Sequence, residues 1–189
     1  AEETTSAVAR AAGEYGEAPM LATMVTNGEL PPVEERLPEK PMVVEPINEI
    51  GKYGGTIRLP FITWPQIQHW LHESLTAFAT DRSYKTIPSL LESWEYLDDN
   101  KKIVFYMREG LKWSDGQPFT ADDIMFWYED VLLNETITPT VSGYYKRGGE
   151  VGVVEKIDEY TFSITFAEPY PLFTTFLGSC GGLRGGQIM

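Results

Sequence analysis

The sequence predicts an α+β fold in which antiparallel hairpins form a sheet and helices pack on it. Two pairs of short apolar strands are the main evidence. The first pair ends at Trp94–Tyr96, turns at 98–101 and returns as Ile103–Met107. The second pair runs over 151–157 and 160–166 with a turn at 158–159. The third observation is a capped helix, predicted over 121–133, that separates the two hairpins.

The first fifty residues predict an acidic, proline-rich arm. They contain ten acidic and three basic side chains and six prolines, which prevent long regular elements. Such a composition favours a solvated, partly extended segment.

Between the arm and the first hairpin, the pattern predicts one strand and one helix. Gly54-Gly55 leads into a short strand at 56–59. Pro65 then begins a predicted helix of about four turns that extends to Phe78, because apolar residues recur at helical spacing. Residues 88–91 predict a short turn or helix.

The run from Met107 to Asp123 predicts a strand end, a tight turn and a helix start. Asp115-Gly116 is a turn dipeptide. Thr120 is suited to the N-cap, and Asp122 and Asp123 are favoured in the first turn. One apolar helix face follows, formed by Ile124, Trp127, Tyr128 and Val131. A polar, aromatic loop at 134–150 and a short apolar helix at 171–177 complete the predicted elements.

Charge and length exclude some functions. The formal net charge of −13 argues against nucleic acid as a partner, because phosphates would be repelled. No apolar run is long enough to cross a bilayer. Cys180 is the only cysteine, so an internal disulfide and a multi-cysteine zinc site are impossible.

The candidates for catalysis or metal binding have simpler structural explanations. His69 and His72 lie three apart beside Glu73, but no further ligand has suitable spacing. Adjacent residues on a helix or turn point in different directions, so the two carboxylates of each pair at 98–99, 122–123 and 129–130 do not face a common site. Turn and cap roles account for the first two pairs. The glycine-rich run 181–186 lacks a phosphate-loop ending. We therefore expect no catalytic residues, no metal and no cofactor.

Aromatic side chains are the best candidates for ligand binding. Trp64, Tyr144 and Tyr145 fall outside helical and strand periodicity, in predicted loops. Aromatic side chains in loops either pack against the core or stack on a ligand, and both roles stay open for these three residues.

Four motifs, in this order, resemble family 5 of the extracellular solute-binding proteins, the dipeptide and oligopeptide class that serves ABC importers. They are Gly54-Gly55-Thr56-Ile57-Arg58, Pro88-Ser89-Leu90-Leu91-Glu92-Ser93-Trp94, the Met107–Asp123 run, and the strand pair that ends at Phe166-Ala167-Glu168-Pro169. The order and spacing agree over residues 51–177.

The resemblance implies the N-terminal part of a two-lobed periplasmic-binding-protein type II fold. Residues 1–50 would be the arm, 51–62 the first strand of lobe I, 63–178 an inserted subdomain, and 179–189 the return toward lobe I. The chain would end before the fold is complete. The family function implied is capture of a solute, followed by delivery to a membrane permease.

The resemblance also places the ligand near two loops. Peptide-binding relatives have an acidic residue soon after the first strand, whereas no acid lies between Arg58 and Glu73 here. Thr63 and Trp64 would border the ligand, and Trp64 would suit a sugar or an apolar solute. Tyr144 or Tyr145 would approach from the loop 134–150.

The expected protein is therefore a solute receptor, not an enzyme, for a peptide or an oligosaccharide. It would be a monomer, exported to the periplasm or cell exterior with its signal peptide removed. The partners would be the solute and an ABC permease. Two alternatives stay open: a stand-alone protein-interaction module that uses the acidic arm, and a hydrolase that uses paired carboxylates.

Overall fold

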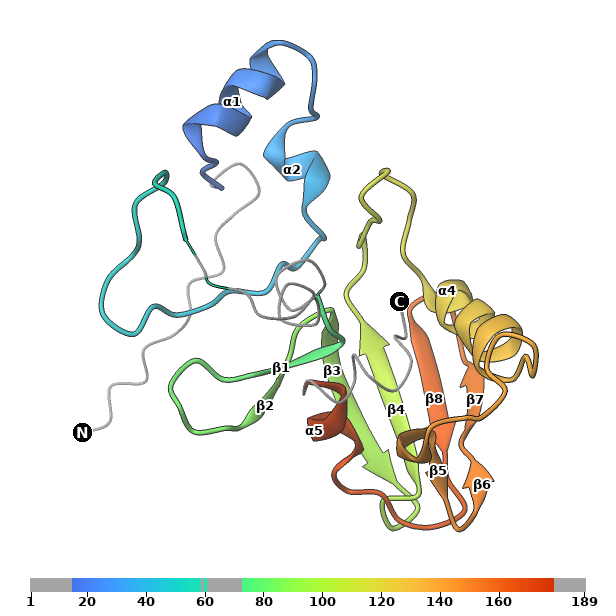
Figure 1. The fold of residues 1–189 in the computed structure, drawn as a ribbon. Coiled ribbons are helices and arrows are strands. Elements are labelled where there is room, and N and C mark those ends of the chain that lie inside the picture. Colours follow the sequence, from blue (N-terminus) through green and yellow to red (C-terminus); the bar gives the residue numbers. More distant parts are fainter. Residues whose placement is uncertain (1–14, 59, 61–72, 179–189) are drawn as a thin grey trace.

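A four-stranded antiparallel sheet is the centre of the protein in the computed structural model, which describes residues 15–58, 60 and 73–178. The strand order is β3-β4-β8-β7 (Figure 1). These strands span Leu91–Leu97, Lys102–Met107, Thr161–Thr165 and Val153–Lys156, respectively. Both predicted hairpins are therefore confirmed, as β3–β4 and β7–β8.

The turn between β3 and β4 depends on residues that tolerate a left-handed backbone. Asp98, Asp99 and Asn100 have φ angles of 50°, 54° and 64°, and the Lys101 amide donates to the Asp98 carbonyl at 3.1 Å. Asp and Asn adopt this conformation more readily than most residues. The acidic pair 98–99 thus has a turn role.

One face of the sheet forms the core. Phe105 of β4 and Phe162 of β8 are opposite each other in the register, are fully buried, and stack at 4.9 Å between ring centroids. Phe173 of helix α5, Phe173–Leu177, packs against Phe105 at 6.4 Å. The predicted helix at 171–177 is confirmed as α5.

The opposite face of the sheet is charged at its edges and buried at its centre, where Val104 and Ser163 are 7% and 0% exposed. Glu95, Val104, Ser163 and Glu155 form one register row across the four strands. Lys102 pairs with Glu155 on this face at 3.6 Å. Charged side chains thus line the edges of this face, whereas α5 packs on the other face.

The capped helix is confirmed, but its second half is wider than predicted. Helix α4 covers Ala121–Phe126, and a π-helical segment, η1, continues over Trp127–Leu132. The Leu133 amide donates to the Tyr128 carbonyl, five residues earlier, at 3.0 Å. A π turn brings residues five apart to the same side, so Trp127 and Leu132 are both buried.

The predicted helix from Pro65 to Phe78 is wrong at its C-terminal end. Thr76–Phe78 is strand β1, paired antiparallel with β2, Thr86–Pro88. The Thr76 hydroxyl is buried and donates to the Thr174 carbonyl at 2.8 Å, which ties β1 to α5. Tertiary contacts thus override the helical spacing. The rest of this prediction, 65–72, lies outside the described residues.

The predicted strand at 56–59 is not found in its described part. In the part of the chain that the structure describes, no segment pairs with residues 56–58 as a strand. Position 59 is outside the described residues.

The loop 134–150 contains more structure than predicted. A 3₁₀ turn, η2, covers Gly143–Tyr145, and a small hairpin joins β5, Lys146–Arg147, to β6, Glu150–Val151. Gly148 and Gly149, with φ of 63° and 86°, form its turn. Two consecutive glycines are a known signal for such a turn, so this hairpin was predictable.

The described part of the arm contains two short helices, α1 (Pro19–Thr26) and α2 (Val33–Arg36). No residue from 15 to 58 is buried, which agrees with the predicted solvated arm. Pro19 occupies the first position of α1, where its missing N–H costs nothing. In Figure 1 the arm lies beside the sheet rather than on its core face. None of the helices in the described segments is long and apolar enough to span a membrane.

Candidate functional site

Tyr144 is the predicted ligand-binding residue that the structure presents to solvent. The Ser142 hydroxyl caps η2 by accepting from the Tyr144 amide at 3.4 Å. The Tyr144 ring stacks on Phe176 of α5, with 4.3 Å between centroids and 12° between planes. The residue remains 47% exposed. One ring face is thus fixed by the stack while much of the side chain stays accessible.

Tyr145 belongs to the core instead. It is 3% exposed and meets Trp127 and Phe176 edge-on at 5.2 and 5.9 Å. Burial, with a smaller contribution from the Tyr170 hydroxyl, raises the pKa of Tyr145 far above its usual value. Adjacent tyrosines therefore have different environments, which the sequence did not distinguish.

A cation–π contact attaches the end of this loop to the core. The Arg147 guanidinium lies 3.2 Å from the centre of the Tyr170 ring. Tyr170 also packs against Phe166 and Phe173 at 5.2 Å each. Burial raises the pKa of Tyr170, and the Arg147 charge opposes the rise. The hairpin β5–β6 is thus attached to the core beside Tyr144.

The other predicted site residues, Thr63 and Trp64, lie outside the described residues. So do His69, His72, Cys180 and the run 181–186. Glu73 is described, and its carboxylate accepts from the Ser89 hydroxyl at 2.6 Å.

The carboxylates of Asp122 and Asp123 have structural partners. Asp122 forms an ion pair with Lys156 at 2.6 Å. Asp123 accepts from the Thr120 amide at 2.8 Å and from Trp113 Nε1 at 3.2 Å, and the Thr120 hydroxyl accepts from the Asp122 amide at 3.2 Å. The predicted N-cap is confirmed, and Thr120 and Asp123 together form a capping box. In the part of the chain that is described, no three His, Cys, Asp or Glu side chains are grouped to hold a metal ion.

Sequence and structure comparisons identify the class. Residues 85–182 match the model for the middle region of the bacterial extracellular solute-binding proteins, family 5. This segment is slightly more than half of the chain and contains the four-stranded sheet. The chain therefore belongs to family 5 of the extracellular solute-binding proteins, and its fold is an N-terminal part of a periplasmic binding protein of type II.

The chain is similar to particular members of that family. It is 36% identical to the periplasmic alpha-galactoside-binding protein of Rhizobium meliloti in an alignment of length 169 that covers 78% of this chain and 24% of that protein. It is 27% identical to the dipeptide-binding protein DppE of Bacillus subtilis in an alignment of length 153 that covers 75% of this chain and 27% of that protein.

Solved structures give the same result. An oligopeptide-binding protein OppA is 39% identical with a TM-score of 0.79, over 93% of this chain and 28% of that one. The periplasmic binding protein MelB of Agrobacterium fabrum, in complex with stachyose, is 28% identical with a TM-score of 0.63. This match covers 87% of this chain and 29% of MelB. The chain thus spans about a quarter of the length of these relatives.

Proposed function

We propose that this chain contributes to the solute receptor of an ABC importer, and that it binds an oligosaccharide or a peptide outside the cytoplasm. Its membership of the family carries the proposal. The relatives are named as binding proteins, not enzymes, and several of them are named as periplasmic. The receptor would work as a monomer that delivers its solute to a membrane permease.

An oligosaccharide is the solute class that the accessible tyrosine favours. Pyranose rings present C–H groups that pack on aromatic faces, and Tyr144 offers a ring held in place by Phe176. Two relatives are named for alpha-galactosides or contain stachyose. We propose Thr63, Trp64 and Tyr144 as ligand contacts. Tyr145 would support the loop, because its ring is buried.

A peptide is the second candidate. It is supported by the similarity to OppA, whose identity to this chain is 39%. A peptide needs partners for its charged ends, whereas Tyr144 supplies a ring and one hydroxyl. The two solute classes are therefore distinguishable by experiment.

Nuclear magnetic resonance titration of the chain tests the proposal. One part of a two-lobed receptor binds weakly, so stachyose and a tripeptide mixture are each titrated into the millimolar range, where the free energy of binding is about −4 kcal/mol. We expect stachyose to shift the signals of Tyr144 and Phe176, and the Tyr144→Ala variant to lose the shifts.

Leu133→Ala is the control, because Leu133 is exposed to a similar extent, 44%. This variant should keep the stachyose response. Shifts with the tripeptides alone would favour the second candidate. If neither solute perturbs the Tyr144 region, the proposed ligand contact is wrong.

A further inference from the structure

The turn that follows β4 presents hydrogen-bonding groups to the arm. We call residues Arg108–Lys112 the seat. Arg108 is held in place because its Nε donates to the Ser89 carbonyl at 2.8 Å and its amide donates to the Leu90 carbonyl at 3.2 Å. Its Nη1 remains directed at the arm, where it donates to the Lys40 carbonyl at 2.7 Å. The guanidinium is thus a preorganised donor.

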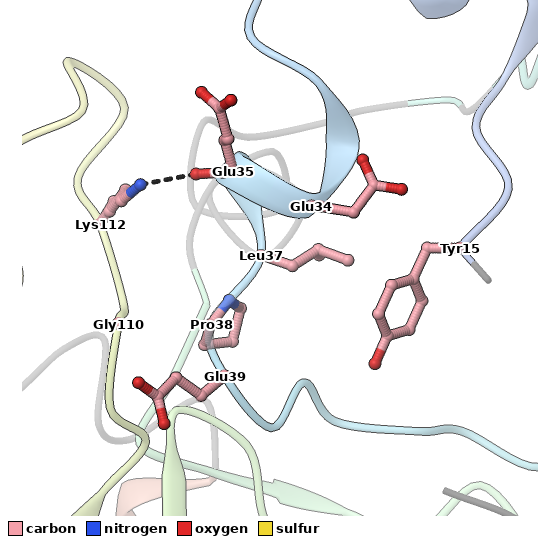
Figure 2. Close-up of a pocket in the computed structure, with 8 residues that line it drawn as sticks. All are labelled: Tyr15, Glu34, Glu35, Leu37, Pro38, Glu39, Gly110 and Lys112. Atoms are coloured by element: carbon pink, nitrogen blue, oxygen red, sulfur yellow. Dashed lines mark hydrogen bonds between the residues drawn. The ribbon is translucent and has the colours of Figure 1, made fainter. Parts of the chain in front are cut away.

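Three hydrogen bonds join the seat to residues 35–40, and each uses a main-chain atom of the arm. Arg108 binds the Lys40 carbonyl, as above. Lys112 Nζ donates to the Glu35 carbonyl at 2.5 Å (Figure 2), and the Glu39 amide donates to the Glu109 carbonyl at 3.0 Å. The seat therefore recognises main-chain groups of the arm rather than particular side chains. A surface ion pair, Lys40 with Glu92 at 2.9 Å, is added at its edge.

Gly110 makes this close approach possible. Its φ is +80°, and a Cβ added there would lie 3.4 Å from the Glu39 nitrogen and 3.5 Å from the Pro38 Cα. Any other residue would be strained by the positive φ, and its Cβ would be in contact with the arm. Glycine at this position thus serves both the turn and the contact.

The contact is polar and incompletely packed. A cavity of about 350 Å³ lies between the seat and the arm. Figure 2 shows Leu37, Pro38 and Tyr15 among the residues that line it. A second cavity, about 440 Å³, lies between Pro31 and the turn at 112–116. Contacts of this kind, without a dry core, open locally at low cost.

The arm also closes on itself. Arg36 pairs with Glu17 and donates from Nε to the Pro31 carbonyl at 3.0 Å. The Tyr53 hydroxyl donates to the Gly16 carbonyl at 3.2 Å. The arm is thus held together by its own hydrogen bonds in addition to its contact with the seat.

We propose that the seat, Arg108–Lys112, is a binding site for main-chain groups and that residues 35–40, the end of α2 and the segment after it, are its occupant. The arm is a strap that docks on the sheet subdomain through this segment and undocks without unfolding the subdomain.

Limited digestion with trypsin tests the strap, because the chain contains an internal reference. Arg36 precedes Leu37 within the contact region, whereas Lys52 precedes Tyr53 beyond it, and Lys40 is protected by the following proline. The three hydrogen bonds between the seat and the arm stabilise the docked state, in which Arg36 is protected. We therefore expect the intact chain to be cut after Arg36 at least about tenfold more slowly than after Lys52.

Two variants separate docking from the local pairing of Arg36 with Glu17. Gly110→Ala and Lys112→Met should each raise cleavage after Arg36 toward the Lys52 rate and leave cleavage after Lys52 unchanged. Gly149→Ala and Lys101→Met are the controls. Gly149 has a similar φ, +86°, with no atom within 4 Å of an added Cβ. Both controls should keep Arg36 protected.

Thermal unfolding of each variant shows whether the subdomain remains folded, and Lys112→Met tests the seat if Gly110→Ala does not fold. The proposal is overturned if Arg36 and Lys52 are cut at equal rates in the unsubstituted chain. It is also overturned if folded seat variants leave the ratio of the two rates unchanged.

Discussion

The sheet subdomain, residues 73–178, and the arm, residues 15–58, are stabilised by different interactions. The subdomain buries a continuous apolar core in which Phe105, Phe162 and Phe173 have no solvent exposure. The arm buries no residue and is held by hydrogen bonds to its main chain. Apolar burial produces cooperative stability, whereas exposed polar contacts produce local, reversible attachment.

The arm also exposes several large apolar side chains that the subdomain would bury. Val43, Ile47 and Ile50 are 75%, 67% and 84% exposed. The same residue types in β4 and β8 are fully or almost fully buried. Substitutions should therefore have large effects in one region and small effects in the other.

The largest effect is expected for Phe105→Ala. The ring is fully buried and contacts two other phenylalanines, so the free energy of unfolding should fall by about 3–5 kcal/mol. Val43→Ala in the arm is the control and should change it by less than about 0.5 kcal/mol. Chemical denaturation measures both. Equal effects would contradict the distinction between the two regions.

A smaller loss is expected for Gly152→Ala, which overfills the core. The added Cβ would lie 2.6 Å from Phe166 Cε1 and 3.1 Å from Ile164 Cγ2. Both side chains are buried, so the cost should be about 1–3 kcal/mol. Gly51→Ala has no atom within 4 Å of its new Cβ and should be nearly neutral. A neutral result at position 152 would show that the core is looser than described.

The third prediction concerns alkaline pH and Tyr145. Burial raises the pKa of this hydroxyl, so the folded state favours the neutral form. Its contribution is complete below the unfolded pKa, near 10, and declines above it by up to about 1.4 kcal/mol per pH unit. The free energy of unfolding of Tyr145→Phe should therefore fall less steeply between pH 10 and pH 11 than that of the unsubstituted chain.

Denaturation at pH 8 provides the reference for both proteins, because the tyrosine is neutral there in both states. Identical slopes above pH 10 would mean that Tyr145 is accessible to solvent.

The smallest effect is expected at the helix cap. Thr120→Ala removes the hydroxyl that accepts from the Asp122 amide, which should cost about 1 kcal/mol. Thr140→Ala, at an exposed position of the following loop, should be neutral. Thermal unfolding compares them. If both variants unfold together, the capping box does not contribute to the stability of α4.

Local sequence signals predicted the subdomain well because they coincide with its packing. The turn residues 98–101 and the cap at Thr120 specify structure through their own backbones, so both appear in the fold as predicted. The helical spacing that ends at Phe78 failed because Thr76 pairs with β2 and bonds to α5, contacts that a local pattern does not contain.

The candidate site was only partly predictable for the same reason. The pair Tyr144 and Tyr145 could be located in a loop, but which ring is buried depends on Trp127 and Phe176, from other elements. The docking of the arm depends on the geometry of Arg108 and Gly110 relative to a segment about seventy residues away. Composition predicted an exposed arm and contained no signal for its attachment.

Residue-resolved hydrogen exchange tests most directly whether the two regions differ in this way. We expect the Phe166 amide, which donates to the Lys101 carbonyl beside the sheet, to exchange only through global unfolding. The Glu39 amide should exchange much faster, through undocking, yet more slowly than the exposed Gly51 amide. Equal rates at Glu39 and Phe166 would show one cooperative unit, and equal rates at Glu39 and Gly51 would show an unattached arm; either result would contradict the account.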